Sequence, residues 1–127
     1  THKFYNTMNK KITNRVSLPV ESLLKEATEQ TLLTVEQEVE LANRIKQGDD
    51  EALMDLYNCN LRFVVSVAKQ YQDRGLTMEE LVEAGKEGLK IASKKFNPSR
   101  KFKFISYAVW YIRQAIQQAI SEHSDNE

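Results

Sequence analysis

Helical periodicity runs through most of this chain, and no stretch of useful length alternates apolar and polar residues as a half-buried strand does. Thr34 with Gln37, and Thr77 with Glu80, each form a capping-box pattern that marks the start of a helix. The proline-containing segment 96–99 is a helix breaker. These signals predict an all-α fold, a compact bundle of about five helices joined by short loops.

We expect one domain, because 127 residues are enough to bury a core without disulfides or metals. The expected helices cover residues 17–27, 34–47, 50–73, 77–95 and 104–120. The expected organisation is a flexible basic arm, a helical domain and an acidic tail that frays, over residues 1–16, 17–122 and 123–127.

The charges sum to zero but are unevenly distributed. Residues 20–55 carry ten acidic groups against three basic ones, whereas residues 86–118 carry eight basic groups against one acid. Such a chain has one surface that attracts anions and another that repels them. On charge alone, lysines that only solvate helix faces are an equally good interpretation.

Six of the eleven aromatic residues lie between 96 and 111, with basic residues among them. At 100° per residue the last helix has one aliphatic face, made of Ile105, Ala108, Val109, Ile112, Ala115, Ile116, Ala119 and Ile120. Its opposite face carries, with Arg113 at the margin, Tyr107, Trp110, Tyr111, Gln114, Gln117 and Gln118. Because the aliphatic face already supplies a core stripe, we expect the aromatic face to point outward.

Exposed aromatic rings beside cations suit a melted nucleic acid. An unstacked base gains roughly 1–3 kcal/mol by stacking on a ring, basic side chains neutralise phosphates, and glutamine hydrogen-bonds base edges. The competing interpretation packs these aromatics against another helix of this chain or of a partner. A helix-turn-helix that reads duplex DNA is disfavoured, because a duplex hides the base faces.

Several blocks of the sequence together resemble conserved region 2 of the sigma-70 family, the factors that direct bacterial RNA polymerase to promoters. They are the run NLRFVVSVAK at 60–69, the glycines at 75, 85 and 88, and the run FKFISYAVWYIRQAI at 102–116. Residues 32–48 resemble region 1.2 of the same family and the helix that follows it. The resemblance covers residues 20–122 and is greatest to the primary or primary-like group. It implies either a fragment or a divergent short factor.

The resemblance implies that the chain captures the −10 promoter element as melted, single-stranded non-template DNA. The positions that would hold and stack a flipped adenine are Phe96, Arg100, Phe102, Phe104, Ser106 and Tyr107. A second base pocket would use Asn60 and Arg62, with Glu36 and Glu38 nearby.

The upstream edge of the melted region would meet the aromatic face of the last helix. Trp110 and Tyr111 match an aromatic pair that wedges there, and Tyr111 stands where the family frequently has a second Trp. The last upstream base pair would face Gln114 and Gln117, and the DNA backbone would be contacted by Arg113 and Lys103.

The resemblance also implies protein partners. The helix over 78–94 would dock on a coiled coil in the largest subunit of core RNA polymerase, with polar contacts from Glu80, Glu83 and Lys86. An anti-sigma protein is a further candidate partner. The alternative function is a sigma-like interaction module that binds polymerase or an anti-sigma partner without reading DNA sequence.

Enzymatic and membrane functions have little support. His2 and His123 lie near opposite ends of the chain, and Cys59 has no histidine near it in the sequence. The chain has no phosphate-binding glycine loop and no apolar run near the roughly 20 residues of a membrane span. We expect a cytoplasmic protein that is not an enzyme and binds no cofactor or metal.

Overall fold

The regular structure is helical throughout the part of the chain that the computed structural model describes, residues 33–98 and 103–125. The elements are α3 (Val35–Lys46), α4 (Asp50–Asn60), α5 (Arg62–Ala68), the 3₁₀ turn η1 (Lys69–Tyr71), α6 (Met78–Lys95) and α7 (Phe104–Asp125). The all-α class is therefore confirmed. The helix expected over 17–27 and the basic arm 1–16 lie outside the described residues.

Both predicted capping boxes are formed. The Gln37 N–H donates to Thr34 Oγ1 at 3.1 Å, and the Thr34 N–H donates to Gln37 Oε1 at 2.8 Å. Thr77 and Glu80 make the same reciprocal pair at 3.1 and 2.9 Å. Each box satisfies two N–H groups near the start of its helix, so α3 and α6 begin where the sequence places them.

The continuous helix expected over 50–73 is wrong, because the structure divides it into α4, α5 and η1. At Leu61 the N–H bonds to the Asn58 carbonyl, three residues back, at 3.4 Å, although Leu61 keeps helical dihedral angles (φ −58°, ψ −37°). The helical path therefore tightens locally without an intervening loop. It ends at Tyr71, before Asp73 and Gly75 take positive φ values of 66° and 108° and reverse the chain.

The last helix is longer than expected, since α7 continues past residue 120 to Asp125 and includes residues 123–125 of the tail that we expected to fray. A hydrogen bond of 3.1 Å from Gln118 Nε2 to Glu122 Oε1 runs along this last part of the helix. Periodicity could not predict the extension, because the residues after 120 carry no apolar stripe.

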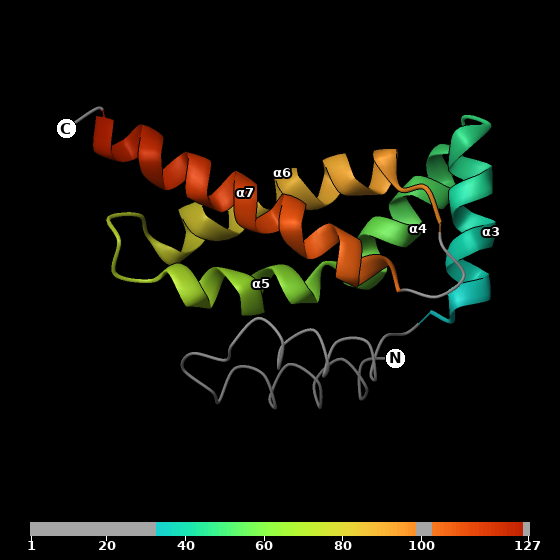
Figure 1. Ribbon diagram of the computed structural model, residues 1–127, viewed down its shortest axis with the longest axis horizontal. Helices are drawn as coiled ribbons and strands as arrows, with labels where there is room; N and C mark the ends of the chain where they lie inside the picture. The colour runs from blue at the N-terminus through green and yellow to red at the C-terminus, as the bar shows by residue number, and fades with distance from the viewer. Residues whose placement is uncertain (1–32, 99–102, 126–127) are drawn as a thin grey trace.

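The two longest helices, α6 and α7, form an antiparallel pair, with α5 packed against both (Figure 1). At one end of the molecule α3 lies across the other helices and packs on α4 (Figure 1). Gly88 lets α6 and α7 approach closely, because a Cβ at this position would lie 2.3 Å from the Tyr111 carbonyl oxygen. The largest fully buried apolar side chains are Phe63, Phe104, Leu56, Leu81, Leu89, Ile105, Ile112, Ile116, Val64 and Val67.

Candidate nucleic-acid interface

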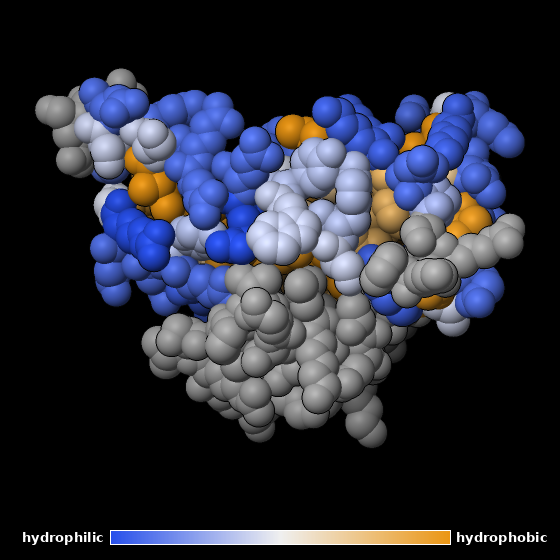
Figure 2. All heavy atoms as spheres, viewed as in Figure 1, coloured by the Kyte–Doolittle hydropathy of each residue, from blue (hydrophilic) through white to orange (hydrophobic). Residues whose placement is uncertain are grey.

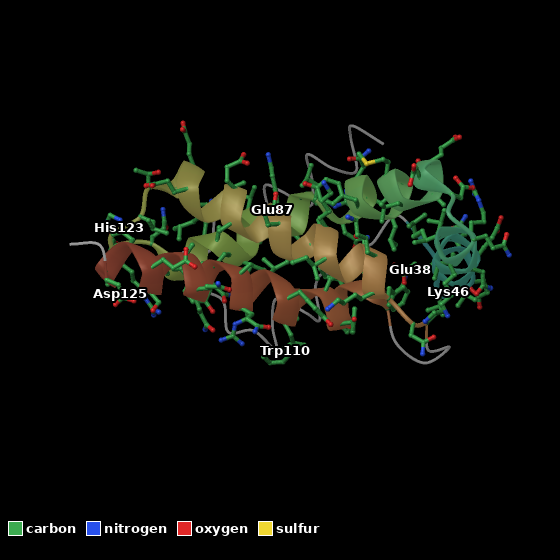
Figure 3. All side chains as sticks on the ribbon, turned by 90° about the horizontal axis from the view of Figure 1, so that it is seen from above. Glu38, Lys46, Glu87, Trp110, His123 and Asp125 are labelled. Carbon is green, nitrogen blue, oxygen red and sulfur yellow. The ribbon has the colours of Figure 1, made fainter. Side chains whose placement is uncertain are left out.

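The outward face of α7 presents one large aromatic ring. Trp110 is 55% exposed and projects from α7 on the side away from α6 (Figure 3). Figure 2 shows a patch of intermediate hydropathy over the middle of α7, with hydrophilic residues on its left side and hydrophobic ones on its right. The prediction that this ring is presented to solvent is confirmed, and the aliphatic face opposite it is buried, with Ile105, Ala108, Val109, Ile112 and Ile116 in the core.

Tyr107 and Tyr111 are only half-buried and belong partly to the core. Their rings lie 5.0 Å apart between centroids, and the Tyr107 hydroxyl donates to the Tyr111 hydroxyl at 2.9 Å. Burial, together with this hydrogen bond, raises the pKa of Tyr107 to about 12. The expectation that the whole aromatic face stands clear of the core is thus correct for Trp110 and only partly correct for the two tyrosines.

Phe96 and Phe104 lie in the core beneath Tyr107. Phe104 is 0% exposed and Phe96 is 7% exposed, and their rings meet edge to face with centroids 4.9 Å apart. Tyr107 rests on both, at centroid distances of 5.7 Å from Phe96 and 6.5 Å from Phe104. In this arrangement the two phenylalanines support the Tyr107 ring, and their expected part in holding a flipped base stays a prediction. Ser106 is half-buried nearby on α7, whereas Arg100 and Phe102 lie outside the described residues.

Arg113 and Gln117 share a partner that sequence reasoning missed. Both donate to the hydroxyl of Tyr71, Arg113 Nε at 2.9 Å and Gln117 Nε2 at 3.0 Å. The Arg113 guanidinium also lies 5.2 Å from the centroid of the Trp110 ring, within the range of a cation–π contact.

Tyr71 is nearly fully buried, and the Arg74 guanidinium lies 5.2 Å from its ring centroid. In the sequence Tyr71 is one member of an apolar stripe, and nothing there identifies its partners on a distant helix. Gln114 is exposed on the same face of α7.

The residues expected in a second base pocket are buried. Asn60 is 1% exposed, and its Nδ2 donates to the Leu56 carbonyl at 2.9 Å. Its Oδ1 has no hydrogen-bond partner among the described residues. Arg62 is also buried, with its guanidinium 5.2 Å from the Phe63 ring centroid. Glu36 is exposed on α3 and does not share this buried environment.

Glu38 connects α3 to the beginning of α7. Its Oε1 accepts the Phe104 N–H at 2.8 Å, while its Oε2 has no hydrogen-bond partner among the described residues. Burial raises the pKa of Glu38, against the smaller lowering effects of the Phe104 N–H and of the Lys103 charge. Lys103 itself donates to the Leu33 carbonyl just before α3. The beginning of α7 is therefore bonded to α3 through Phe104 and Glu38, and to the residues just before α3 through Lys103 and Leu33.

A second contact joins α3 to the segment after α6. Lys46 lies in the last turn of α3, and its ammonium group donates to Asn97 Oδ1 at 3.1 Å. Figure 3 labels Glu38 and Lys46, the two α3 residues that make these side-chain connections.

The predicted docking residues lie along the first half of α6. Glu83 is exposed and Lys86 is half-buried, and the Lys86 ammonium lies 3.3 Å from Glu83 Oε1. Glu80 is exposed, but its carboxylate is held in the Thr77 capping box, and that backbone hydrogen bond lowers its pKa. Glu80 and Glu83 also line an open hollow of about 550 Å³, together with Leu76, Glu79, Ala119, Glu122 and His123. None of the helices in the described ranges combines the length and apolar content that crossing a bilayer requires.

Comparisons with known proteins show the family to which the chain belongs. The family described as Sigma-70 region 2 matches residues 56–125, and the family described as Sigma-70 factor, region 1.2 matches residues 19–51. Over 110 residues, 87% of this chain, the sequence is 46% identical to "RNA polymerase sigma factor SigA" of Bacillus sp and 44% identical to the protein of the same name of Listeria monocytogenes serovar 1/2a. The chain spans 29% of the length of each of these relatives. It belongs to the sigma-70 family, whose members are transcription initiation factors and not enzymes.

Proposed function

We propose that this chain is the part of a bacterial transcription initiation factor that recognises the −10 promoter element as melted non-template DNA. The observation that carries the proposal is Trp110, more than half exposed on a helix whose opposite face completes the core, with the Arg113 guanidinium over its ring. A large ring kept in solvent beside a cation is suited to an unpaired base and the phosphate next to it. We place its action in the cytoplasm.

A flipped adenine would stack on Tyr107. The buried rings of Phe96 and Phe104 support Tyr107 from the core side, so its outer side is the one open to a base. Extrusion of a base from a duplex costs a few kcal/mol, which a preformed stacking surface offsets. Arg100, Phe102 and Ser106 are proposed as further contacts of the same pocket.

A second flipped base would enter between α3 and the start of α7. Glu38 Oε2 and Asn60 Oδ1 are buried acceptors without hydrogen-bond partners among the described residues, and each such atom costs about 1–3 kcal/mol. A base edge that carries N–H donors would satisfy them. Arg62 and Lys103 are proposed to contribute positive charge near the phosphates.

We propose that α6 docks on core RNA polymerase, on a coiled coil of its largest subunit. The support is the exposed polar surface formed by Glu80, Glu83 and Lys86. Trp110 projects from α7 on the side away from α6 (Figure 3), so the ring that would stack on a base points away from the helix that would bind polymerase.

The test is binding of two fluorescent single-stranded oligonucleotides, one with the −10 consensus in the non-template sense and one with the same bases scrambled. The consensus is expected to bind more tightly, and the affinity of both is expected to fall as salt rises, because phosphate contacts release counterions. Repeating the measurement with core polymerase added tests the α6 contact through Glu83→Lys, which reverses one exposed charge. Equal affinity for the two oligonucleotides, with polymerase still bound, would favour the interaction module that does not read sequence.

A further inference from the structure

The two tyrosines of α7 form a hydrogen-bonded pair. Tyr107 and Tyr111 are one helical turn apart, so their side chains lie on the same face. Their hydroxyl oxygens are 2.9 Å apart, and their rings are tilted by 49° with centroids 5.0 Å apart. A phenylalanine at either position would keep the ring and lose this bond.

The Tyr107 ring also makes aromatic contacts with the core. Phe96 and Phe104 contact it from the core at tilted angles of 42° and 47°. Such ring contacts prefer certain orientations but bind weakly, at about 0.5–1.5 kcal/mol for each pair beyond burial. Among the described residues, the hydroxyl bond to Tyr111 is the side-chain hydrogen bond of Tyr107, and it is directional because a hydrogen bond weakens steeply when its geometry departs from linear.

We propose that Tyr111 is a positioning residue whose hydroxyl holds the Tyr107 ring in the orientation that receives a flipped base. This inference rests on the proposed function, and it gives Tyr111 a role that acts through Tyr107. A side chain that is fixed before the base arrives loses less conformational freedom on binding, so the Tyr111 hydroxyl raises the affinity of Tyr107 for the base without itself contacting the base.

The geometry makes the role separable from folding. Tyr111 is half-buried, and its hydroxyl accepts from a second half-buried side chain, so Tyr111→Phe removes one oxygen and leaves no deeply buried polar atom behind. Tyr57 offers a matched control, because it is a half-buried tyrosine on α4 and Tyr57→Phe makes the same chemical change away from the α7 face.

The experiment compares the intact chain with Tyr111→Phe, Tyr107→Phe and Tyr57→Phe for binding of the consensus oligonucleotide. Tyr111→Phe is expected to weaken binding by about three- to tenfold, as the loss of one hydrogen bond predicts. Tyr57→Phe is expected to leave binding unchanged. A double variant that combines Tyr107→Phe with Tyr111→Phe is expected to bind no more weakly than Tyr107→Phe alone, because both single changes remove the same hydrogen bond.

A second oligonucleotide carries an abasic site in place of the adenine that is expected to flip. With no base to stack on Tyr107, Tyr111→Phe is expected to bind this oligonucleotide as well as the unchanged chain does. An equal loss on both oligonucleotides, or no loss on the consensus, overturns the positioning role. If the unchanged chain does not distinguish the consensus from the scrambled sequence, the proposed function itself fails, which is a different result.

The pair has a signature that does not depend on DNA. In a titration followed by NMR of ¹³C-labelled tyrosine, the Tyr107 pKa is expected near 12 in the unchanged chain. In Tyr111→Phe it is expected to move toward its ordinary value of 10.0, but not to reach it, because burial is the larger cause of the shift. An unchanged Tyr107 pKa would show that the bond does not hold Tyr107 in solution and would overturn the proposal.

Discussion

The hydroxyl of Tyr71 accepts hydrogen bonds from Arg113 Nε at 2.9 Å and from Gln117 Nε2 at 3.0 Å, which fixes two polar side chains of α7 against the end of η1. Arg113 in turn lies over the Trp110 ring. The orientation of the exposed tryptophan and its neighbouring cation therefore depends on a buried residue from a different part of the chain.

Tyr71→Phe is expected to lower the free energy of unfolding by about 1 kcal/mol, since both donors can turn to water once the hydroxyl is gone. Because Arg113 is proposed to contact the DNA backbone, the variant is expected to bind the consensus and the scrambled oligonucleotide more weakly, by the same factor for both. The Arg74 contact uses the ring and remains. Urea denaturation and oligonucleotide titration measure the two effects, with Tyr57→Phe as the control. A loss restricted to the consensus would contradict the backbone role of Arg113.

Trp110 is the single tryptophan of the chain, so its fluorescence reports on the proposed interface alone. Binding of the consensus oligonucleotide is expected to quench it through base stacking. Trp110→Ala is expected to cost about 1–3 kcal/mol of binding free energy, but less than about 1 kcal/mol of stability because the ring is largely in solvent. Trp110→Phe should recover part of the affinity. Unchanged fluorescence at saturating oligonucleotide would rule out stacking on this ring.

Glu38 makes stability depend on pH. Its folded-state pKa is raised by burial, so the native state holds the proton more tightly than the unfolded state does. Protonation of Glu38 therefore stabilises the native state. This stabilisation is fully present when the pH is below the pKa of Glu38 in the unfolded chain, near 4.5, and is lost as the pH rises through the raised pKa of the folded chain.

Glu38→Gln keeps an acceptor for the Phe104 N–H and removes the charge. The free energy of unfolding of the unchanged chain is therefore expected to fall, relative to the variant, as pH rises from about 4.5 toward neutrality. Urea denaturation across this range measures the difference, and Glu36→Gln, at an exposed position in the same turn, controls for the loss of one charge. A difference that stays constant with pH would contradict the prediction.

Gly88 is predicted to tolerate substitution least among the described glycines. A Cβ there meets the backbone of Tyr111, which cannot rotate away, whereas a Cβ at Gly85 lies 2.6 Å from a side-chain atom of Val64. Gly88→Ala is expected to cost about 3 kcal/mol or more, as severe overpacking does. Gly48 has no atom within 4 Å of such a Cβ, but its φ of 90° makes Gly48→Ala cost about 1–2 kcal/mol. Thermal unfolding of Gly88→Ala, Gly85→Ala and Gly48→Ala tests whether Gly88→Ala is the most destabilising.

Local signals predicted the fold well. The capping boxes at Thr34 and Thr77 depend on residues three positions apart, so the sequence contains both partners of each. The exposure of Trp110 also followed from helical phase within α7. The break at Leu61 did not, because no glycine or proline marks it and the residue keeps helical dihedral angles.

The candidate site was harder to predict where it depends on contacts between distant segments. Phe104 receives its cap from Glu38, 66 residues earlier, and no local pattern pairs them. Helical phase placed Tyr107 on the outward face, but its partial burial depends on Phe96, which follows a different helix. The burial of Phe96 and Phe104 was likewise not predicted, since an aromatic residue near a candidate binding surface can lie beneath it.

The connections of α3 have a consequence for the short stretch 99–102, which joins α6 to α7 and includes the proposed contacts Arg100 and Phe102. On one side of this stretch Asn97 is bonded to Lys46, and on the other side Phe104 is bonded to Glu38. Both partners belong to the same helix, so α3 bonds to the chain on either side of the stretch. Lys46 belongs to this helix and is not among the residues proposed to contact DNA, so its substitution is expected to alter the proposed recognition of the −10 element only indirectly.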